Sequence, residues 1–409
     1  MNVLIICYVH PPEHAPTGVN CAELAEDLVK SGHKVTILTG WPSHPEGSLY
    51  PGWHARFRQT TQTEEGYRLI RCGHALHPRF NKFWKLWFYF TFAISSFING
   101  LFTGKVDVIV SCSTLVFGPL TSWSLAKVKR ARYVYWVQDI HPETIRNAGL
   151  ISETNPIYRL LLASDKFICR HSTLVGTLTD AMQQILVARG LDPKKVILMM
   201  HWVDAKKIPP CSSDNPWRRE HEIDLNKFVV LHAGTIGYIS GAEVVIDAAQ
   251  IIADRTDILF LIVGDGPLKE KLIARSHKYG LKNVKFLPFQ GADVLAQMQA
   301  TGDVGLVTLL PESGGSSIPS KMHGYTAAGK PVIASVADDS PTARMIRNGN
   351  FGIVCPVQDP QAIAQAILHL AENRSEAEEM GRRGREFFLS IFDREICTRQ
   401  IEQILTSIV

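Results

Sequence analysis

The chain contains 409 residues, a length that suits two domains of ordinary size better than one. Its content of 45% hydrophobic and 20% charged residues excludes disordered, collagen-like and coiled-coil proteins. The 43 basic and 39 acidic residues leave a formal net charge of +4, too balanced for a dedicated nucleic-acid-binding protein. We therefore expect a globular two-domain protein in which any anionic partner is bound by a local group of basic residues.

The cysteines and the N-terminus indicate the compartment. The eight cysteines contain no C-x-x-C pair, so neither a zinc framework nor a disulfide-rich secreted scaffold is indicated. The first residues lack the basic segment and cleavage site of an export signal and read as an apolar strand. We expect a cytoplasmic protein.

The first domain is predicted to be α/β. An apolar run at residues 3–6, an amphipathic run at 19–30 and a second apolar run at 35–38 predict a β-α-β unit. Short, continuously apolar strands separated by helices are typical of a parallel sheet covered on both faces. Residues 1–205 are expected to form one doubly wound, Rossmann-like domain. Its further strands are predicted at residues 67–72, 106–110, 133–137, 173–175 and 196–200.

A similar second domain follows a linker. Residues 206–226 are rich in proline, serine and charge, and have no sustained period, which predicts the linker. Residues 227–386 are expected to form a second doubly wound domain. Since open parallel sheets bind ligands beyond the carboxyl ends of their strands, we expect the chemistry in a cleft between the domains. The strands of the second domain are predicted at residues 228–231, 258–263, 284–287, 304–307, 332–334 and 352–354.

The segment from Phe83 to Phe102 is aromatic-rich, lacks acidic residues and approaches the length of a membrane span. Polar residues recur every four positions from Thr91 to Thr103, which favours an amphipathic helix. Such a helix is expected either to lie on an anionic membrane, with the protein peripheral on the inner face of the cytoplasmic membrane, or to be buried in the first domain. The first possibility is supported by a basic cluster at the start of the helix, Arg79, Lys82 and Lys85.

Glycine-containing loops follow three strands. Gly18 ends the loop after the first strand, where backbone amides at a helix N-terminus can approach a ligand. In the second domain, Gly234 and Gly237 follow the first strand, and Gly264 and Gly266 follow the second. No dinucleotide fingerprint or P-loop is present, so NAD binding and ATP hydrolysis are not indicated. The two loops of the second domain favour a nucleotide pocket, with simple turns as the alternative.

The most informative stretch covers residues 312–335. Paired glycines free the backbone, Pro319 suits the first turn of a helix, and Ser320 and Lys321 stand beside that turn's unsatisfied amides. This combination predicts a diphosphate cradle in which Lys321 supplies the cation, unless Lys321 is a solvated surface residue.

Three ionisable residues, Asp139, His141 and Glu143, lie within five positions at a strand end of the first domain. In an extended segment their side chains would project to the same side, where one could act as a general base on a substrate hydroxyl. The alternatives are that His141 packs at a helix entry and that Glu143 interacts with the helix dipole.

Together with the two predicted domains, the sequences WVQDIHPE, AGTIG, GDGP and PSK-x-x-x-Y-x-A-A-G-K-P resemble the retaining, GT-B fold glycosyltransferases called group 1 (family 4 type). The similarity extends over nearly the whole chain and is greatest to the branch that builds bacterial surface polysaccharides, including the colanic-acid and O-antigen transferases. The resemblance implies a hexosyl or N-acetylhexosaminyl transferase, with a nucleotide-diphosphate sugar as donor in the C-terminal domain. It further implies a lipid-linked or oligosaccharide acceptor in the N-terminal domain, no metal or other cofactor, and a C-terminal helix at about residues 387–409 that returns to the first domain.

The sequence departs from the family pattern at three places. Gln138 stands where much of the family has a catalytic histidine, so Asp139 is expected to replace it. Ser316 and Gly324 stand where the family has two glutamates. The loop after the first strand of the second domain lacks the family's basic pair, which leaves Lys321 as the expected main cation.

Stabilising the nucleotide-diphosphate leaving group is the main task of such a transfer, and Asp139, His141 or Glu143 is expected to handle the acceptor proton. The expected donor-binding residues are Gly18, Gly234, Thr235, Gly237, Gly264, Gly266, Phe289, Ser316, Ser317, Ser320, Lys321 and Tyr325.

Two other functions remain open from the sequence. A UDP-sugar 2-epimerase would share the fold and use converging acid and base residues such as His141 and Glu143. A non-catalytic sugar-nucleotide-binding subunit would explain the missing glutamates.

Overall fold

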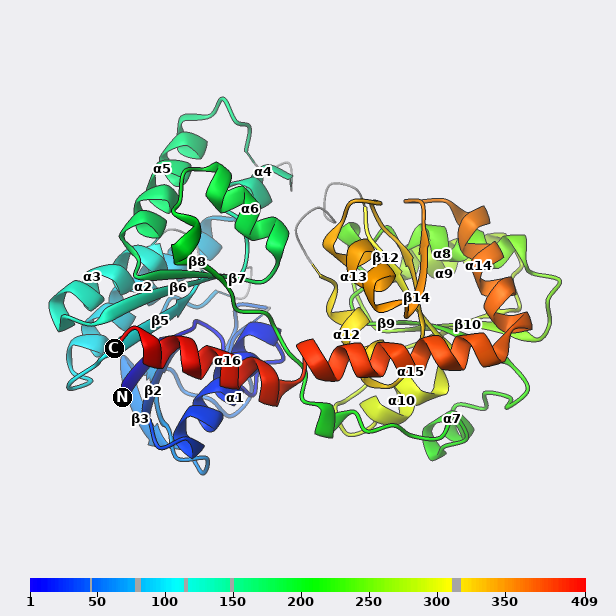
Figure 1. The fold of residues 1–409 in the computed structure, drawn as a ribbon, viewed down its shortest axis with the longest axis horizontal. Helices are drawn as coiled ribbons and strands as arrows, with labels where there is room; N and C mark the ends of the chain where they lie inside the picture. Colours follow the sequence, from blue (N-terminus) through cyan, green and yellow to red (C-terminus); the bar gives the residue numbers. More distant parts are fainter. Residues whose placement is uncertain (45, 78–81, 114–116, 148–150, 311–317) are drawn as a thin grey trace. The chain divides into compact units, whose positions relative to one another are not determined.

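The structure, a computed structural model, describes residues 1–44, 46–77, 82–113, 117–147, 151–310 and 318–409. The chain divides into two compact units, Met1–His201 with Cys397–Val409, and Trp202–Ile396. Each unit contains one mainly parallel sheet with helices packed against it (Figure 1). The predicted α/β class with two doubly wound sheets is confirmed.

The sheet of the first unit has eight strands in the order β3-β4-β2-β1-β5-β6-β7-β8. All neighbouring strands are parallel except β3 and β4, which are antiparallel. The sequence predicted the other seven strands but not β3, because its residues RQTTQ are all polar and all exposed. The bounds are β1 (Asn2–Ile6), β2 (Lys34–Thr39), β3 (Arg58–Gln62), β4 (Arg68–Cys72), β5 (Val108–Cys112), β6 (Arg132–Val137), β7 (Leu174–Thr177) and β8 (Val196–Leu198).

Two helices of the first unit begin at side-chain caps. Asn155 accepts a hydrogen bond from the Ile157 amide at the start of α5, and Thr179 accepts one from the Met182 amide at the start of α6. The last helix of the chain, α16, is tied to this unit, because Glu402 contacts Ser31 and His33. The helices are α1 (Pro16–Lys30), α2 (Lys82–Leu101), α3 (Phe117–Lys129), α4 (Glu143–Asn147), α5 (Pro156–His171), α6 (Asp180–Ala188) and α16 (Arg394–Ser407).

Helix α2 turns its polar side inward. The Ser95, Asn99 and Thr103 side chains are buried, and the Asn99 amide donates to the Ser95 carbonyl one turn earlier. Its exposed side carries Trp87 and Ile98, among other apolar residues. Within the ranges that the structure describes, no helix is long and apolar enough to cross a membrane.

The six predicted strands of the second unit are all present, in the order β11-β10-β9-β12-β13-β14, and every neighbouring pair is parallel. The order reverses between β9 and β12, the kind of switch point where doubly wound sheets bind ligands. The strands are β9 (Phe228–Ala233), β10 (Ile258–Val263), β11 (Val284–Leu287), β12 (Val304–Thr308), β13 (Val332–Ser335) and β14 (Gly352–Cys355).

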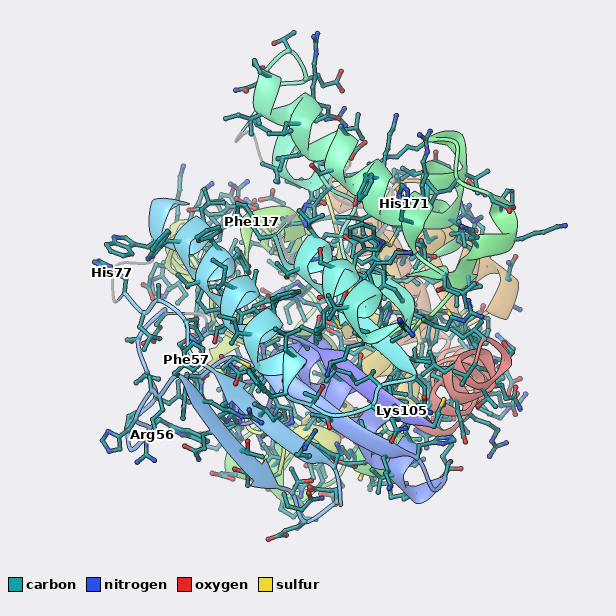
Figure 2. The ribbon with its side chains drawn as sticks, turned by 90° about the vertical axis from the view of Figure 1, so that its left-hand side faces the viewer. Arg56, Phe57, His77, Lys105, Phe117 and His171 are labelled. Carbon is teal, nitrogen blue, oxygen red and sulfur yellow. The ribbon has the colours of Figure 1, made fainter. Side chains whose placement is uncertain are left out.

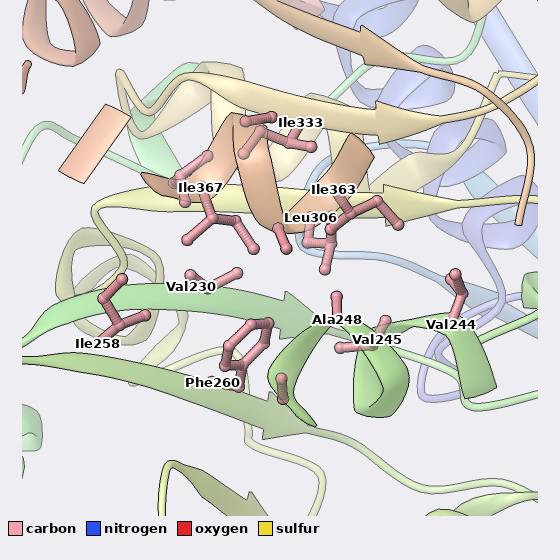
Figure 3. Close-up of a cluster of buried hydrophobic side chains, with 14 of the residues drawn as sticks. Val230, Val244, Val245, Ala248, Ile258, Phe260, Leu306, Ile333, Ile363 and Ile367 are labelled. Carbon is pink, nitrogen blue, oxygen red and sulfur yellow. The ribbon is translucent and has the colours of Figure 1, made fainter. Parts of the chain in front are cut away.

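The core of the second unit lies between the sheet and the helices α8 and α14 (Figure 3). Val230 and Phe260 of the sheet pack with Ala248 of α8 and Ile363 of α14, all of them fully buried. This rigid layer holds the strand ends that carry the glycine loops. The helices are α7 (Pro216–Glu220), α8 (Glu243–Ile251), α9 (Lys269–Lys278), α10 (Leu295–Thr301), α12 (Ser320–Ala327), α13 (Pro341–Gly349), α14 (Pro360–Glu372) and α15 (Arg374–Ile391).

Part of the segment 206–226 packs against the second unit. Trp217 and Arg218 of α7 are buried there, and the Trp217 indole donates to the Gln290 side chain at 3.0 Å. The Arg218 guanidinium donates to backbone carbonyls, including that of Thr301 at the end of α10. An arginine that satisfies several carbonyls at once holds the entering chain in one place.

Candidate functional site

Two glycine loops meet at the carboxyl ends of β9 and β10. A side chain at Gly264 would place its Cβ 2.0 Å from the Gly234 carbonyl oxygen, and one at Gly266 would come within 2.4 Å of the Ile236 oxygen. Both positions therefore require glycine so that the two backbones can pack together. The sequence had singled out these loops, and the structure brings them together beside the start of α12.

Lys321 lies against the first of these loops. Its Nζ is 3.0 Å from Nε2 of His232 and donates to the Thr235 carbonyl oxygen at 3.3 Å. A Cβ on Gly234, which has a φ of +116°, would lie 3.2 Å from Lys321 Cε. The glycine thus leaves room for the lysine stem at the loop.

Desolvation lowers the pKa values of both Lys321 and His232. It lowers the pKa of Lys321 to about 7, so this lysine is only partly charged at neutral pH. His232 is 1% exposed, and burial together with the nearby lysine holds its pKa well below the usual value. His232 Nδ1 has no hydrogen-bond partner among the described residues. The sequence reading missed His232, because it lies inside the apolar run of β9 and looks like a core residue.

The other predicted donor-binding residues occupy different surroundings. Ser320 and Thr235 are exposed at the loops, and the backbone of Gly237 caps a short 3-10 turn, 238–240. Phe289 is an exposed aromatic ring whose backbone amide donates to Asp265 at 2.8 Å. Tyr325 is fully buried, and its hydroxyl accepts from the Ala233 amide at 2.8 Å, so it orders the end of β9 from within. Ser316 and Ser317 lie outside the described residues, as do the paired glycines before them.

In the first unit, Asp139 is exposed just beyond the end of β6. The backbone amides of Gln138 and Asp139 donate to Ser113 Oγ, at 2.8 and 3.4 Å, which fixes this turn. Nearby, burial lowers the pKa of His141, while the charges of Asp139 and Glu143 act on it in the opposite direction. The structure therefore places the three predicted residues within electrostatic range of one another.

Glu143 is held by an arginine that the sequence reading missed. Arg189, just after α6, forms ion pairs with both Glu143 and Asp165, the latter at 2.7 Å, and donates to the His141 carbonyl oxygen at 3.1 Å. Burial raises the pKa of Asp165 to about 6, although Arg189 opposes the rise. Arg189 is 46 positions from Glu143 in sequence, so no local sequence motif predicts their contact.

Gln138 is also part of a contact network. Its side-chain oxygen contacts Nε2 of His201 and accepts from the Thr17 hydroxyl at 3.3 Å. Desolvation lowers the pKa of His201 to about 4, so this ring is neutral at physiological pH. A neutral histidine is thus present beside Gln138, although it comes from a different strand end.

Gly18, in the first turn of α1, is required by close packing, because its Cβ would lie 2.9 Å from the Val9 carbonyl oxygen. The preceding loop is organised by Glu13, which is almost fully buried. Its carboxylate accepts from the backbone amides of His10, Ser43 and His44. This acid therefore fixes the loop next to the start of α1.

Two family models match the chain. The model described as "Glycosyl transferase 4-like domain" matches residues 17–200, and the one described as "Glycosyl transferases group 1" matches residues 213–387. Together they cover most of both units. The chain belongs to the group 1 glycosyltransferases. These enzymes transfer a sugar from a nucleotide-sugar donor, and the expectation from the sequence motifs is confirmed.

Curated group 1 glycosyltransferases include several bacterial relatives. The chain is 27% identical to the putative colanic acid biosynthesis glycosyl transferase WcaI of Escherichia coli, over 80% of this chain and 82% of the relative. It is 28% identical to the D-rhamnosyltransferase WbpZ of Pseudomonas aeruginosa, over 62% of each chain.

Solved structures share the fold across the whole chain. The sucrose-phosphate synthase of Thermosynechococcus elongatus superposes with a TM-score of 0.77 at 18% identity, covering 100% of this chain and 98% of the other. Anabaena HepE in complex with UDP and glucose gives a TM-score of 0.70 at 18% identity, with both chains fully covered. These similarities confirm the GT-B fold for this group 1 glycosyltransferase.

Proposed function

We propose that this enzyme transfers a hexosyl or N-acetylhexosaminyl residue, with retention, to a lipid-linked or oligosaccharide acceptor in bacterial surface-polysaccharide synthesis. The names of the relatives WcaI and WbpZ support this role. The observation that carries the proposal is Lys321, whose ammonium lies between His232 and the Thr235 carbonyl where the glycine loops meet.

The donor diphosphate is proposed to bind where Lys321 and the first turn of α12 offer positive potential. The unsatisfied amides at a helix start and a lysine beside them both favour a group whose negative charge grows as the sugar–phosphate bond breaks. On donor binding, Lys321 would exchange its contact with neutral His232 for a stronger, charge-assisted hydrogen bond to the diphosphate. In this proposal the lysine and the helix amides together stabilise the negative charge of the leaving diphosphate.

The acceptor is proposed to bind in the first unit near Asp139. Among the three candidate acids and bases, Asp139 is exposed, whereas the Glu143 carboxylate is engaged with Arg189. Asp139 is therefore the best available group to receive the proton of an acceptor hydroxyl. The epimerase alternative needed Glu143 as a free acid or base, and this ion pair counts against it.

The donor is tested with a panel of UDP-, GDP-, TDP- and ADP-sugars in thermal-shift assays, since a ligand that binds the native state raises its melting temperature. With the best nucleotide diphosphate, Lys321→Ala should lower affinity about 10- to 100-fold, the loss expected for a hydrogen bond to a charged group. Lys278→Ala, an exposed lysine of α9 in the same unit, is the matched control and should bind normally.

Unchanged affinity in Lys321→Ala would place the diphosphate elsewhere. Turnover of a sugar donor by the purified chain alone would exclude the non-catalytic subunit, whereas absence of turnover with every donor and a lipid-linked acceptor would favour it.

We also propose that the enzyme works at an anionic membrane surface. The outer face, which we define as Leu86, Trp87, Ile94, Ile98 and Phe102 of α2 and its following turn, with Leu120 and Val128 of α3, is made of exposed apolar side chains. Figure 2 shows this side of the first unit, with α2 and α3 side by side. Exposed apolar side chains that gather on two neighbouring helices are typical of an interaction site.

The charges around the outer face favour lipid over a protein partner. Neither α2 nor α3 contains an acidic residue, and Lys127 is exposed beside Val128. Helices that combine exposed apolar residues with basic residues and have no acidic ones are typical of an anionic interface. A lipid-linked acceptor would be reached from this position.

A further inference from the structure

Three cysteines from separate elements meet in the core of the first unit. Cys7 directly follows β1, Cys21 lies on α1, and Cys112 is the last residue of β5. Their exposed fractions are 1%, 0% and 2%, and none of them forms a disulfide. We call these residues the thiol cluster; the sequence, with no C-x-x-C pair, gave no sign of it.

The distances within the thiol cluster suit a three-coordinate metal ion. The three Sγ atoms all lie within 4.8 Å of one another, and those of Cys21 and Cys112 are 3.3 Å apart. An ion bound at a metal–sulfur distance of about 2.3 Å in a trigonal plane separates its sulfurs by about 4.0 Å. The separation of Cys21 and Cys112 is shorter than this value and no pair exceeds 4.8 Å, so small side-chain rotations are enough to form the site.

The three sulfur ligands of the thiol cluster determine which metal ions it can bind. Sulfur ligands favour soft metals such as Cu(I), whereas a structural Zn²⁺ site needs four ligands. No fourth histidine, cysteine or carboxylate joins the group among the described residues. Burial of all three side chains also keeps water from completing a tetrahedron.

We propose that Cys7, Cys21 and Cys112 form a buried binding site for one thiophilic metal ion of the Cu(I) type. Each sulfur that binds as a thiolate releases one proton to the solvent, and no electron is transferred, so no oxidant is required. Because the ligands come from the end of β1, from α1 and from β5, the ion would cross-link three elements of the first unit.

The test is anaerobic titration of the reduced full chain with Cu(I) in competition with a chromogenic Cu(I) chelator. Because Cys211 is the only cysteine that is not buried, it is replaced by serine in every protein used. We expect one Cu(I) per chain, with sulfur-to-copper charge-transfer absorption, and a raised melting temperature.

Cys112→Ala and, separately, Cys21→Ser should abolish the retained copper, the absorption and the thermal shift. Cys72→Ala is the matched control, since Cys72 is equally buried at the end of β4 but lies outside the cluster, and it should retain one equivalent. Circular dichroism and the melting temperature without metal establish that each variant is folded.

The proposal is overturned if the parent chain yields all of its copper to the chelator, or if Cys112→Ala and Cys21→Ser, folded by these criteria, retain as much copper as Cys72→Ala. Donor binding to the second unit is measured in parallel, so loss of the donor site would be distinguished from loss of the metal site.

Discussion

Lys321, which we propose binds the donor diphosphate, shows how such a residue can lower stability before a ligand binds. Its pKa lies well below that of a free lysine because the surrounding protein removes water from the ammonium group. In a lysine with a lowered pKa, the penalty on folding is fully present below the folded pKa, near 7, and disappears as the pH rises towards the unfolded value. A diphosphate supplies the missing counter-charge.

The affinity for the donor nucleotide should therefore depend on pH through Lys321. Above about pH 7, binding must restore a proton to the lysine, so the affinity for UDP or the selected diphosphate should fall by up to tenfold per pH unit. Calorimetry at pH 8 in two buffers of different ionisation enthalpy should measure uptake of up to one proton. Lys321→Met should abolish the uptake and raise the melting temperature of the ligand-free protein; equal proton uptake in the variant would contradict the assignment.

Asp139 is expected to act in the transfer step and not in donor binding. Asp139→Asn keeps the size of the side chain and removes its charge, so turnover should fall by about two orders of magnitude while affinity for the donor nucleotide stays unchanged. Initial rates and calorimetry on the same preparation check both statements. Near-normal turnover would transfer the role to His141 or Glu143, which are then replaced singly.

Arg189 is expected to stabilise the first unit. Arg189→Met leaves the buried Asp165 without its partner and should cost about 3 kcal/mol of unfolding free energy at pH 8. Asp165 has a raised pKa, so its contribution to stability falls as the pH rises from about 4 to 6, and the cost of the variant should be smaller at pH 5. Urea unfolding at both values measures this.

Arg146→Met, which breaks an exposed pair with Glu153, is the control for Arg189 and should cost less than about 1 kcal/mol. If the two variants were equally stable, Arg189 would have no structural role at this site.

At the scale of elements, helix α2 buries its polar side and exposes apolar side chains, the reverse of an ordinary surface helix. Its polar residues are satisfied inside the protein by its own backbone and neighbours, while tryptophan and isoleucine side chains face outward. The sequence predicted the helix and its polar side but could not decide which side faces solvent. Periodicity identifies two faces of a helix, and only tertiary packing assigns one of them to the core.

The outer face should be required for lipid binding. Trp87→Ser combined with Ile98→Ser should lower the recovery on phosphatidylglycerol-containing vesicles at least tenfold in flotation, because two apolar side chains are lost from the interface. Leu225→Ser with Ile251→Ser removes two comparably exposed apolar side chains from the second unit and should have no effect. Equal flotation of both variants would exclude the outer face as the contact.

The sequence predicted elements well where apolar residues repeat and poorly where they do not. All six strands of the second unit are buried apolar runs and were identified, whereas the polar edge strand β3 was missed. The segment 206–226 was predicted to be a linker from its proline, serine and charge content, and that composition does not show that Trp217 contacts Gln290. A run of apolar residues predicts that an element is buried, but local composition does not predict a single buried residue within a polar segment.

The same limit applies to the candidate site. The glycine loops, Lys321 and the segment from Gln138 to Glu143 are local signals that a sequence can show. The contacts that they make come from distant positions: His232 with Lys321, Arg189 with Glu143 and His201 with Gln138. Which buried polar residue meets which loop depends on strand order, and a single sequence does not specify it.

On the scale of the whole molecule, the first unit is completed by the last helix. Ile401 and Leu405 of α16 are buried, and Thr398 and Glu402 contact α1 and the turn after it. Helix α16 therefore adds buried apolar side chains to the first unit, in addition to its polar contacts with α1 and the turn after it.

Leu405→Ala should destabilise the first unit selectively. Removing a buried leucine side chain costs about 2–5 kcal/mol, and hydrogen exchange should accelerate in β1, β2 and α1 while amides of β9 to β14 stay protected. Leu370→Ala, an equally buried leucine of α14, should give the reverse pattern. Faster exchange in both units with Leu405→Ala would indicate that the units unfold as one.

The return of α16 also sets an order of events during synthesis. The first unit begins at Met1 but lacks Cys397–Val409 until the ribosome has made the ~195 residues of the second unit, which takes roughly 10–40 s. Throughout this interval the part of the first unit that α16 covers is exposed, while the second unit, which is continuous in sequence, can already fold. The unit whose synthesis begins first is thus the last to be completed, and it keeps apolar surface exposed until Ile401 and Leu405 have been made.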